Sequence, residues 1–312
     1  MNAPLSCRRS TGCTGRTIAG VCTPKGSGTE EIRRGLISLP VIHKGAEYRA
    51  ADAHAHIYHE KIAEKATASV GAFYDLNMDN VGLPAVLLEQ GEGAGIDRFA
   101  VCSVATKVEQ VRSINGFIEG ECKKHPEFVG LAAWHQDIED IEGEMDDIER
   151  RGLRGIKLHP DFQEFQIDDP KLMPFYRAAH RRGLPILFHT GDKRKDFSSP
   201  RRLARLLDRL PELCCIAAHL GGYTEWEAAR ECLKAPNVYV DTSSSIAFIG
   251  RDEALKSIYR FGIDRVMFGT DFPMWRASEE LERFFGLGLS ESENRAILYG
   301  NFARLYKLDK DG

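Results

Sequence analysis

From residue 48 onward, short apolar segments alternate with longer segments whose apolar residues recur at helical spacing. The predicted strands are Tyr48–Ile57, Arg98–Ala105, Phe128–His135, Leu153–Pro160, Leu184–Thr190, Cys214–Gly221, Val238–Ser243 and Arg265–Asp271. The predicted helices are Val108–Lys124, Ile138–Arg150, Pro170–Arg182, Pro200–Leu210, Thr224–Lys234, Glu253–Phe261, Glu279–Phe285 and Ser290–Leu308. Strands that alternate with amphipathic helices pair in parallel through right-handed crossovers. Eight such units with nearly continuously apolar strands predict an α/β protein with a closed (β/α)8 barrel of the TIM type.

The first 47 residues differ in kind from the rest of the chain. Gly, Ser, Thr, Cys and Arg dominate them, and no periodic apolar face begins before Leu36. Such a segment cannot bury enough apolar surface to form a core of its own. We therefore expect an N-terminal tail over residues 1–47 and a single barrel domain over residues 48–312.

Composition narrows the classes of partner. The formal net charge of −4 gives no basic footprint for nucleic acid or for an anionic membrane, and no apolar stretch approaches the roughly 20 residues that span a bilayer. The eight cysteines include no Cys-x-x-Cys pair, which is typical of a reduced, cytoplasmic protein. We expect a small-molecule substrate, no nucleic-acid or membrane partner, and a homodimer, since barrels of this kind often pair through their outer helices.

Two histidines at the end of the first predicted strand are the strongest chemical signal. His54 and His56 belong to the segment Asp-Ala-His-Ala-His. Residues two apart in a strand point to the same side, so both imidazoles can bind one metal ion. The pair alone is weak evidence, because polar strand ends often carry histidines without any chemical role.

Other polar residues end the strands that follow. They are Lys157, His159, His189, His219 and Asp271. Because the carboxyl ends of all eight strands meet at one face of a barrel, these side chains gather on one rim. Neutral imidazoles with a carboxylate suit Zn²⁺ and also accept Mn²⁺, Fe²⁺ or Co²⁺. No cysteine joins this rim, which favours a catalytic site with an open position over a structural zinc site.

Six motifs, in this order along the chain, carry a family resemblance. They are Asp52-Ala-His-Ala-His56, Gly155-Ile-Lys-Leu-His-Pro160, Phe188-His-Thr-Gly191, Ala218-His-Leu-Gly-Gly222, Phe268-Gly-Thr-Asp-Phe-Pro273 and Gly300-Asn-Phe-Ala-Arg304. Over roughly four fifths of its length, from about Asp52 to Leu308, the chain resembles the amidohydrolase superfamily. Within that superfamily it is similar to the amidohydrolase-related group (amidohydrolase 2), which includes the aminocarboxymuconate-semialdehyde decarboxylase-like enzymes.

The resemblance implies a (β/α)8 barrel with one or two divalent metals and gives each rim residue a role. His54, His56 and His189 match metal ligands of the family. Asp271 matches the aspartate that both ligates the metal and shuttles protons. His219 matches the histidine that polarises the substrate or activates water, so Asp271 and His219 are the expected catalytic residues. We expect one divalent metal, Zn²⁺ before Mn²⁺, and leave a second metal open.

The roles of two residues on the fourth predicted strand have more than one interpretation. Lys157 is suited to holding a substrate carboxylate, to a structural ion pair, or, as in binuclear relatives, to carboxylation and bridging of two metals. His159 lies two residues further on, and we expect it to contact the substrate unless a loop carbonyl satisfies its ring.

Three functions are compatible with these residues. The first is a metal-dependent hydrolase that uses metal-activated water on an amide, lactone or ester of a small substrate, carboxylated or not. The second is a metal-dependent non-oxidative decarboxylase (a carboxy-lyase) of the same family. The third is a metal-binding scaffold without catalysis, which would be expected to have lost some of the rim residues. The hydrolase is the first expectation, because activated water is the default chemistry of such a site.

Overall fold

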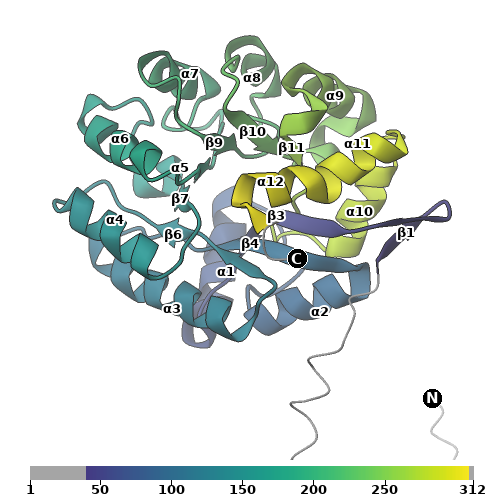
Figure 1. The fold of residues 1–312 in the computed structure, drawn as a ribbon, viewed down its shortest axis with the longest axis horizontal. Coiled ribbons are helices and arrows are strands. Elements are labelled where there is room, and N and C mark those ends of the chain that lie inside the picture. The colour runs from purple at the N-terminus through teal and green to yellow at the C-terminus, as the bar shows by residue number, and fades with distance from the viewer. Residues whose placement is uncertain (1–39, 309–312) are drawn as a thin grey trace, which may run out of the picture. The chain divides into compact units, whose positions relative to one another are not determined.

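The computed structural model of the protein describes residues 40–308, and most of the predicted tail lies outside them. Parallel strands form the centre and helices surround them (Figure 1). The barrel strands are β3 (Ala50–His56), β4 (Ile96–Cys102), β5 (Phe128–Gly130), β6 (Ala132–Ala133), β7 (Ile156–Leu158), β8 (Ile186–Phe188), β9 (Cys215–Ala217), β10 (Val238–Asp241) and β11 (Val266–Met267). Within the described residues, β3-β4-β5 and β6-β7-β8-β9-β10-β11 are two consecutively ordered parallel sheets.

Backbone hydrogen bonds join the two sheets into one closed barrel. β5 and β6 are a single barrel strand interrupted at Leu131, whose N–H donates to the carbonyl of Val101 at 2.9 Å. On the other side, the N–H of Ala53 donates to the carbonyl of Phe268 at 2.8 Å. The eight predicted strands and the predicted closure are therefore confirmed, with strands shorter than the apolar segments that indicated them.

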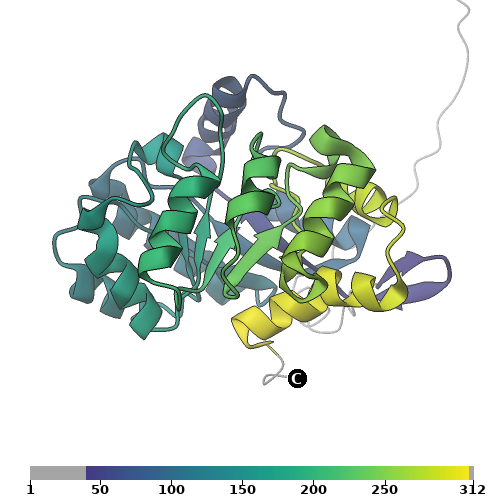
Figure 2. The ribbon, with the colours of Figure 1, turned by 90° about the horizontal axis from the view of Figure 1, so that it is seen from above.

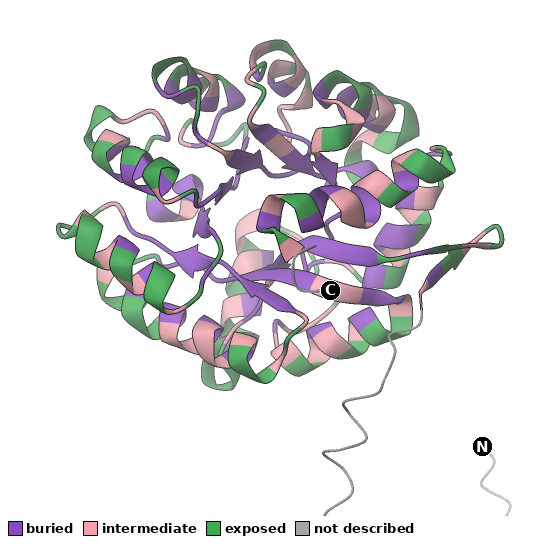
Figure 3. Cartoon of the chain, viewed as in Figure 1, coloured by how far each residue is buried: buried purple, intermediate pink, exposed green. Residues whose placement is uncertain are grey.

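Helices cover the outside of the barrel, and their outward faces are exposed while the strands are buried (Figure 3). The helices are α1 (Glu60–Tyr74), α2 (Pro84–Ala94), α3 (Val111–Lys124), α4 (Ile141–Arg150), α5 (Pro160–Gln163), α6 (Met173–Arg181), α7 (Pro200–Arg209), α8 (Trp226–Cys232), α9 (Ile246–Phe261), α10 (Ala277–Phe285), α11 (Glu291–Arg295) and α12 (Asn301–Tyr306), with 3₁₀ turns at Val108–Gln110, Pro170–Leu172 and Ile263–Arg265. The alternation of apolar residues did not predict α1 and α2, which both lie between β3 and β4. Within residues 40–308, no helix has both the length and the apolar composition needed to span a bilayer.

A short hairpin precedes the first barrel strand. β1 (Val41–His43) and β2 (Ala46–Tyr48) pair antiparallel, and the turn residues Lys44 and Gly45 have φ values of 49° and 82°. The ring of His43 stacks on Phe285 with 4.0 Å between ring centroids, and Tyr48 is 4% exposed. These contacts attach the hairpin to α10, so a short paired segment precedes residue 48, where the barrel domain was predicted to begin.

The C-terminal segment closes the amino-terminal end of the barrel, whereas α1 stands over the opposite end (Figure 2). Phe302 and Tyr306 of α12 pack against the small inward-facing residues of the strands, among them Ala51 and Ala53. The one helix predicted over Ser290–Leu308 is instead α11, the π-helical turn η5 (Ala296–Gly300) and α12. The helical pattern changes there because the carbonyl of Ile297 accepts the N–H of Phe268 at 3.0 Å.

Asn301 ties this segment to β11, and its removal tests that role. Its Nδ2 donates to the carbonyls of Ile263 and Val266, both at 2.6 Å, and the residue is 1% exposed. Asn301→Ala leaves those carbonyls without this donor, so we expect the free energy of unfolding to fall by about 1–3 kcal/mol in urea titrations. The exposed Ser292→Ala on α11 should change it by less than about 0.5 kcal/mol. Equal stability of the two variants would contradict a structural role for Asn301.

Candidate metal centre

An irregular register in β3 aims its histidines into the barrel. The pairing of β3 with β4 shifts between Asp52 and Ala55. Bulges of this kind re-aim side chains next to active sites. Asp52 holds the irregularity in place, because its Oδ1 accepts the backbone N–H of His54 at 3.0 Å and that of Thr270 at 2.9 Å. Asp52 thus holds strand ends together and does not touch an imidazole ring.

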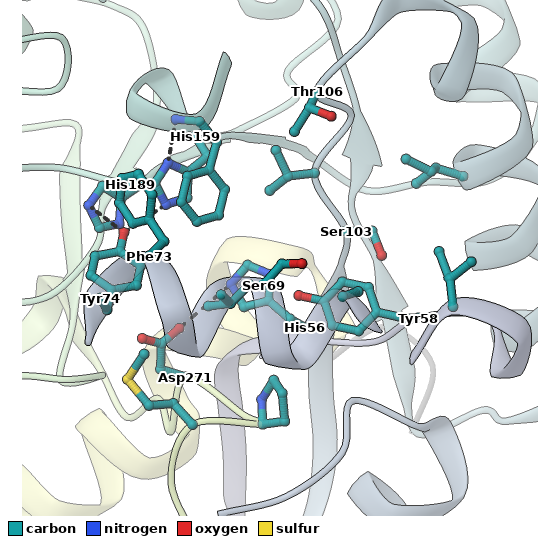
Figure 4. Close-up of a pocket in the computed structure, with 18 of the residues that line it drawn as sticks. His56, Tyr58, Ser69, Phe73, Tyr74, Ser103, Thr106, His159, His189 and Asp271 are labelled. Atoms are coloured by element: carbon teal, nitrogen blue, oxygen red, sulfur yellow. Dashed lines mark hydrogen bonds and ion pairs between the residues drawn. The ribbon is translucent and has the colours of Figure 1, made fainter. Parts of the chain in front are cut away.

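Three ligand atoms converge where β3 and β11 end. The Nε2 atoms of His54 and His56 lie 3.1 Å apart, and each lies 3.6 Å from Oδ1 of Asp271. Figure 4 shows His56 and Asp271 facing each other in this pocket. We call these three residues the metal triad, and their ligand atoms lie within 4.8 Å of one another. The structure therefore brings together three of the four predicted ligands.

The electrostatics of the triad favour a cation among these atoms. Burial and the neighbouring Lys157 lower the pKa of His54 to about 4, so its imidazole is neutral and its lone pair is available. Although burial opposes ionisation, the surrounding histidines hold the pKa of Asp271 well below its usual value. Burial also works against a charged His56, yet Cys102 and Asp271 raise its pKa to about 9. The donor set, two imidazoles and a carboxylate, fits a divalent metal that accepts nitrogen and oxygen ligands.

Asp241, at the end of β10, orients the first ligand. Its Oδ2 lies 3.1 Å from Nδ1 of His54, and it is fully buried. A carboxylate at Nδ1 fixes the tautomer that leaves Nε2 free for a metal and makes the imidazole a stronger ligand. The Oγ of Ser243 lies 3.1 Å from the same Nδ1 and donates to Asp241. The rim residues predicted from the sequence did not include Asp241, although it lies within the predicted strand Val238–Ser243, two residues before its end.

Ser244 orients the carboxylate of the triad. Its hydroxyl donates to Oδ2 of Asp271 at 2.6 Å and accepts the indole N–H of Trp275 at 2.9 Å. Oδ1 of Asp271 is the oxygen that faces the two imidazoles. Neither Ser244 nor Trp275 was predicted to act in this way.

A second histidine cluster lies beside the triad. Nδ1 of His189 is 3.0 Å from Nε2 of His219, and Nδ1 of His219 is 3.1 Å from the carbonyl of Ser243. Among the described residues, the groups of three or more ligand-type side chains do not include His189. Ligation by His189 therefore stays a prediction from the resemblance. So does a proton-moving role for His219, whose ring centroid lies 5.2 Å from that of His54.

Lys157 and His159 have different surroundings. The Nζ of Lys157 lies 2.8 Å from Nε2 of His54, and burial lowers the pKa of this ammonium group. Lys157 is 1% exposed, and its contact with a substrate, like its carboxylation, stays a prediction. His159 does line the cavity, and its Nε2 lies 2.9 Å from the hydroxyl of Tyr74.

A cavity of about 910 Å³ opens above the triad. His54, His56, Asp271, His189 and His219 all line it. Its apolar walls come mainly from α1, α3 and the strand ends: Ile62, Val70, Phe73, Val104, Ile114, Phe117, Phe162, Met78 and Met274. Among the described lining residues the cations are Lys61, Lys65 and Lys195, and there is no arginine. The site is thus a chamber with largely apolar walls, in which the metal triad and the two further histidines form a polar group.

Three residues of the rim have left-handed backbone conformations. The φ values are 62° for His219, 43° for Ser244 and 61° for Asp271. Such conformations are unfavourable for residues other than glycine and persist only where the surroundings enforce them. The barrel thus holds three neighbouring strand ends in backbone conformations that these residue types adopt only under constraint.

The sequence and the fold of this chain both match those of known proteins. The family model described as Amidohydrolase matches residues 51–308. No curated protein matches the sequence. The solved structures below share less than 20% identity with it and therefore show the fold alone.

Three solved structures illustrate the likeness. An uncharacterised TIM-barrel protein from Bordetella bronchiseptica has a TM-score of 0.68 at 19% identity, covering 82% of this chain and 98% of its own. A dihydroxybenzoic acid decarboxylase from Polaromonas sp. JS666, with bound manganese and the inhibitor 2-nitroresorcinol, has a TM-score of 0.66 at 16% identity and coverages of 84% and 98%. A putative 2-pyrone-4,6-dicarboxylic acid hydrolase from Pseudomonas putida has a TM-score of 0.62 at 16% identity and coverages of 85% and 99%.

Metal content tests the triad directly. Asp271→Asn and the double variant His54→Ala/His56→Ala each remove ligand atoms, so we expect purified protein to lose its stoichiometric Mn²⁺ or Zn²⁺ in elemental analysis. Asp252→Asn makes the same chemical change at an exposed position of α9 and should keep the metal. Full metal content in the triad variants would refute this ligand set.

The orienting role of Asp241 predicts a smaller effect than loss of a ligand. Asp241→Asn weakens the acceptor at Nδ1 of His54, so we expect the metal affinity to fall by roughly 10–100-fold in competition titrations with a chelator. Thermal unfolding of the apo-protein checks that the fold is retained. An affinity equal to that of Asp252→Asn would mean that Asp241 does not act through His54.

Proposed function

This chain belongs to the amidohydrolase family, and we propose that it is a metal-dependent enzyme that removes CO₂ from a carboxylic acid. The rest of the substrate is apolar, and an aromatic ring is the simplest group of this kind. The observation that carries this proposal is the metal triad at the floor of a largely apolar cavity of about 910 Å³. The Polaromonas decarboxylase, whose structure contains manganese, adds support through its shared fold. We propose one divalent cation per chain, Mn²⁺ or Zn²⁺.

The surroundings of the triad suit the loss of a carboxylate. Val104, Ile114 and Phe117 line the cavity and offer apolar surface to an apolar substrate. When CO₂ leaves, the negative charge of the carboxylate moves to the substrate carbon, and between apolar walls that charge needs a positive partner. A divalent cation bound to the triad would hold the carboxylate and stabilise developing negative charge.

The reaction also needs a proton donor. When the carbon–carbon bond breaks, its electron pair stays on the substrate carbon, and a proton must be delivered there as CO₂ leaves. Asp271 and His219 line the cavity, and both were predicted to move protons. Because the pKa of Asp271 is held low, its carboxylate would first have to accept the proton that it delivers. Ser244 fixes the carboxylate of Asp271, and Ser243 lies within 3.1 Å of the ring of His219, so both groups are held in place.

Hydrolysis is the second candidate. The same two side chains can accept a proton from water that attacks an amide, lactone or ester, and the shared fold of the Pseudomonas hydrolase supports this alternative. The two reactions differ in their products, because decarboxylation releases CO₂ while hydrolysis adds the elements of water.

Product analysis tests the proposal. We expect Mn²⁺- or Zn²⁺-loaded protein to release CO₂ in a coupled bicarbonate assay, and chelation to abolish that release. The substrates are a panel of aromatic carboxylic acids, some of which also carry an ester, lactone or amide group. Asp271→Asn should lower kcat by about 10²–10⁴-fold, while Asp252→Asn should not change it. A mass increase of one water without CO₂ would replace decarboxylation with hydrolysis, and conversion by chelated protein would contradict metal dependence.

A further inference from the structure

One hydroxyl group beside the metal triad has no role in the reaction described above. Tyr58 follows His56 by two residues, in the loop between β3 and α1, and it lines the cavity. Figure 4 shows the hydroxyl end of the Tyr58 ring turned toward His56. Among residues 40–308, no group forms a hydrogen bond with this hydroxyl. A phenol keeps its proton at neutral pH, so Tyr58 is an unpaired donor next to the triad.

The hydroxyl oxygen of Tyr58 is open to the cavity. The residue as a whole is half-buried. The fully buried side-chain oxygens without a hydrogen-bond partner in residues 40–308 all belong to other residues. The unpaired oxygen of Tyr58 therefore keeps accessible surface, and it keeps it in the chamber that the ring lines.

The backbone of Gly82 fixes the position of the Tyr58 ring. The N–H of Tyr58 donates to the carbonyl of Gly82 at 2.7 Å, and the N–H of Gly82 donates to the hydroxyl of Thr67 on α1 at 3.0 Å. A Cβ atom at residue 82 would lie 2.5 Å from Cδ2 and 2.7 Å from Cε2 of Tyr58. Glycine is therefore required for this close approach to the ring. The hydroxyl group is thus held in place before any ligand enters.

Most other hydroxyl groups of the cavity already have protein partners. Those that donate to a protein acceptor belong to Ser69, Ser103, Thr106, Ser113 and Ser244. The hydroxyl of Tyr74 lies 2.9 Å from Nε2 of His159. The hydroxyl of Tyr223 has no hydrogen-bond partner in the described part of the chain, but this residue follows β9 and its ring packs against His219. Tyr58 is therefore the unpaired donor on the chain segment that carries His56.

A carboxylate at the triad needs such a donor. It has two oxygens, and between apolar walls an oxygen without a positive partner or a donor costs free energy. A cation held by the triad would satisfy one oxygen, which leaves the other for a neighbouring group.

From this arrangement we infer that the hydroxyl of Tyr58 donates a hydrogen bond to the carboxylate that the substrate loses. The inference rests on the proposed function, which supplies that carboxylate. The bond weakens as the charged carboxylate becomes neutral CO₂, so it stabilises the bound substrate more than the transition state. Tyr58 thus contributes to substrate binding and orientation, and it does not lower the barrier to bond breaking.

Benzoate binding to the Mn²⁺-loaded protein tests this role without any turnover. Tyr58→Phe removes only the hydroxyl group, so we expect the affinity measured by calorimetry to fall at least about tenfold, with metal content unchanged. Tyr259→Phe makes the same change at an exposed position of α9 and should bind benzoate like the unaltered protein. Equal affinities of the two variants, or no benzoate binding by the unaltered protein, would overturn the inference.

A crystal structure of the unaltered Mn²⁺-loaded protein with benzoate gives a test that needs no variant. We expect a carboxylate oxygen within 3.2 Å of the hydroxyl oxygen of Tyr58. A carboxylate bound at the triad with both oxygens out of reach of Tyr58 would overturn the assignment.

Kinetics separate binding from chemistry. With an acid that the protein converts, Tyr58→Phe should raise KM about tenfold and change kcat by less than about twofold. A fall in kcat of about 100-fold with KM unchanged would overturn the binding role, because Tyr58 would then act in the bond-breaking step. Benzoate binding that depends on Tyr58, in a protein that releases CO₂ from no acid, would reject the proposed reaction alone.

Discussion

The close approach of three ligand atoms at the ends of β3 and β11 is the constraint on which the site depends. Two imidazole nitrogens and a carboxylate oxygen lie 3.1–3.6 Å from one another in the barrel interior. Lone pairs at these distances repel unless a proton or a cation lies among them, and burial strengthens that repulsion. Asp241 behind His54 and Ser244 behind Asp271 hold these groups in place. The protein thus maintains an arrangement that only positive charge makes favourable.

The barrel supplies the rigidity that this arrangement needs. Each contributing strand is fixed on both sides by neighbouring strands, and α12 fills the opposite end with Phe302 and Tyr306. The chain can therefore bear irregular backbone at the rim, including the shifted register of β3 and the left-handed conformations of His219 and Asp271. Stability and chemistry occupy opposite ends of the barrel, as is general for this architecture.

The barrel and the triad could be predicted because both follow from short-range patterns. Alternating apolar segments indicate parallel strands, and the residues that end those strands must share one rim, which brought His54, His56 and Asp271 together. Asp241 also ends a strand, but an aspartate followed by Thr-Ser-Ser reads equally well as the start of a turn. The contact of Lys157 with Nε2 of His54 depends on the depth of each strand in the barrel, which residue spacing does not encode. The hairpin before β3 depends on a contact between His43 and Phe285, which are far apart in the sequence.

Anomalous diffraction from crystals of the Mn²⁺-loaded protein, recorded at the manganese edge, tests the central claim most directly. One strong peak per chain about 2.0–2.3 Å from Nε2 of His54, Nε2 of His56 and Oδ1 of Asp271 is the expected result. The same map decides whether His189 or Lys157 joins the coordination. No peak among the three atoms, or a peak bound elsewhere, would contradict the assignment of this rim as a metal centre.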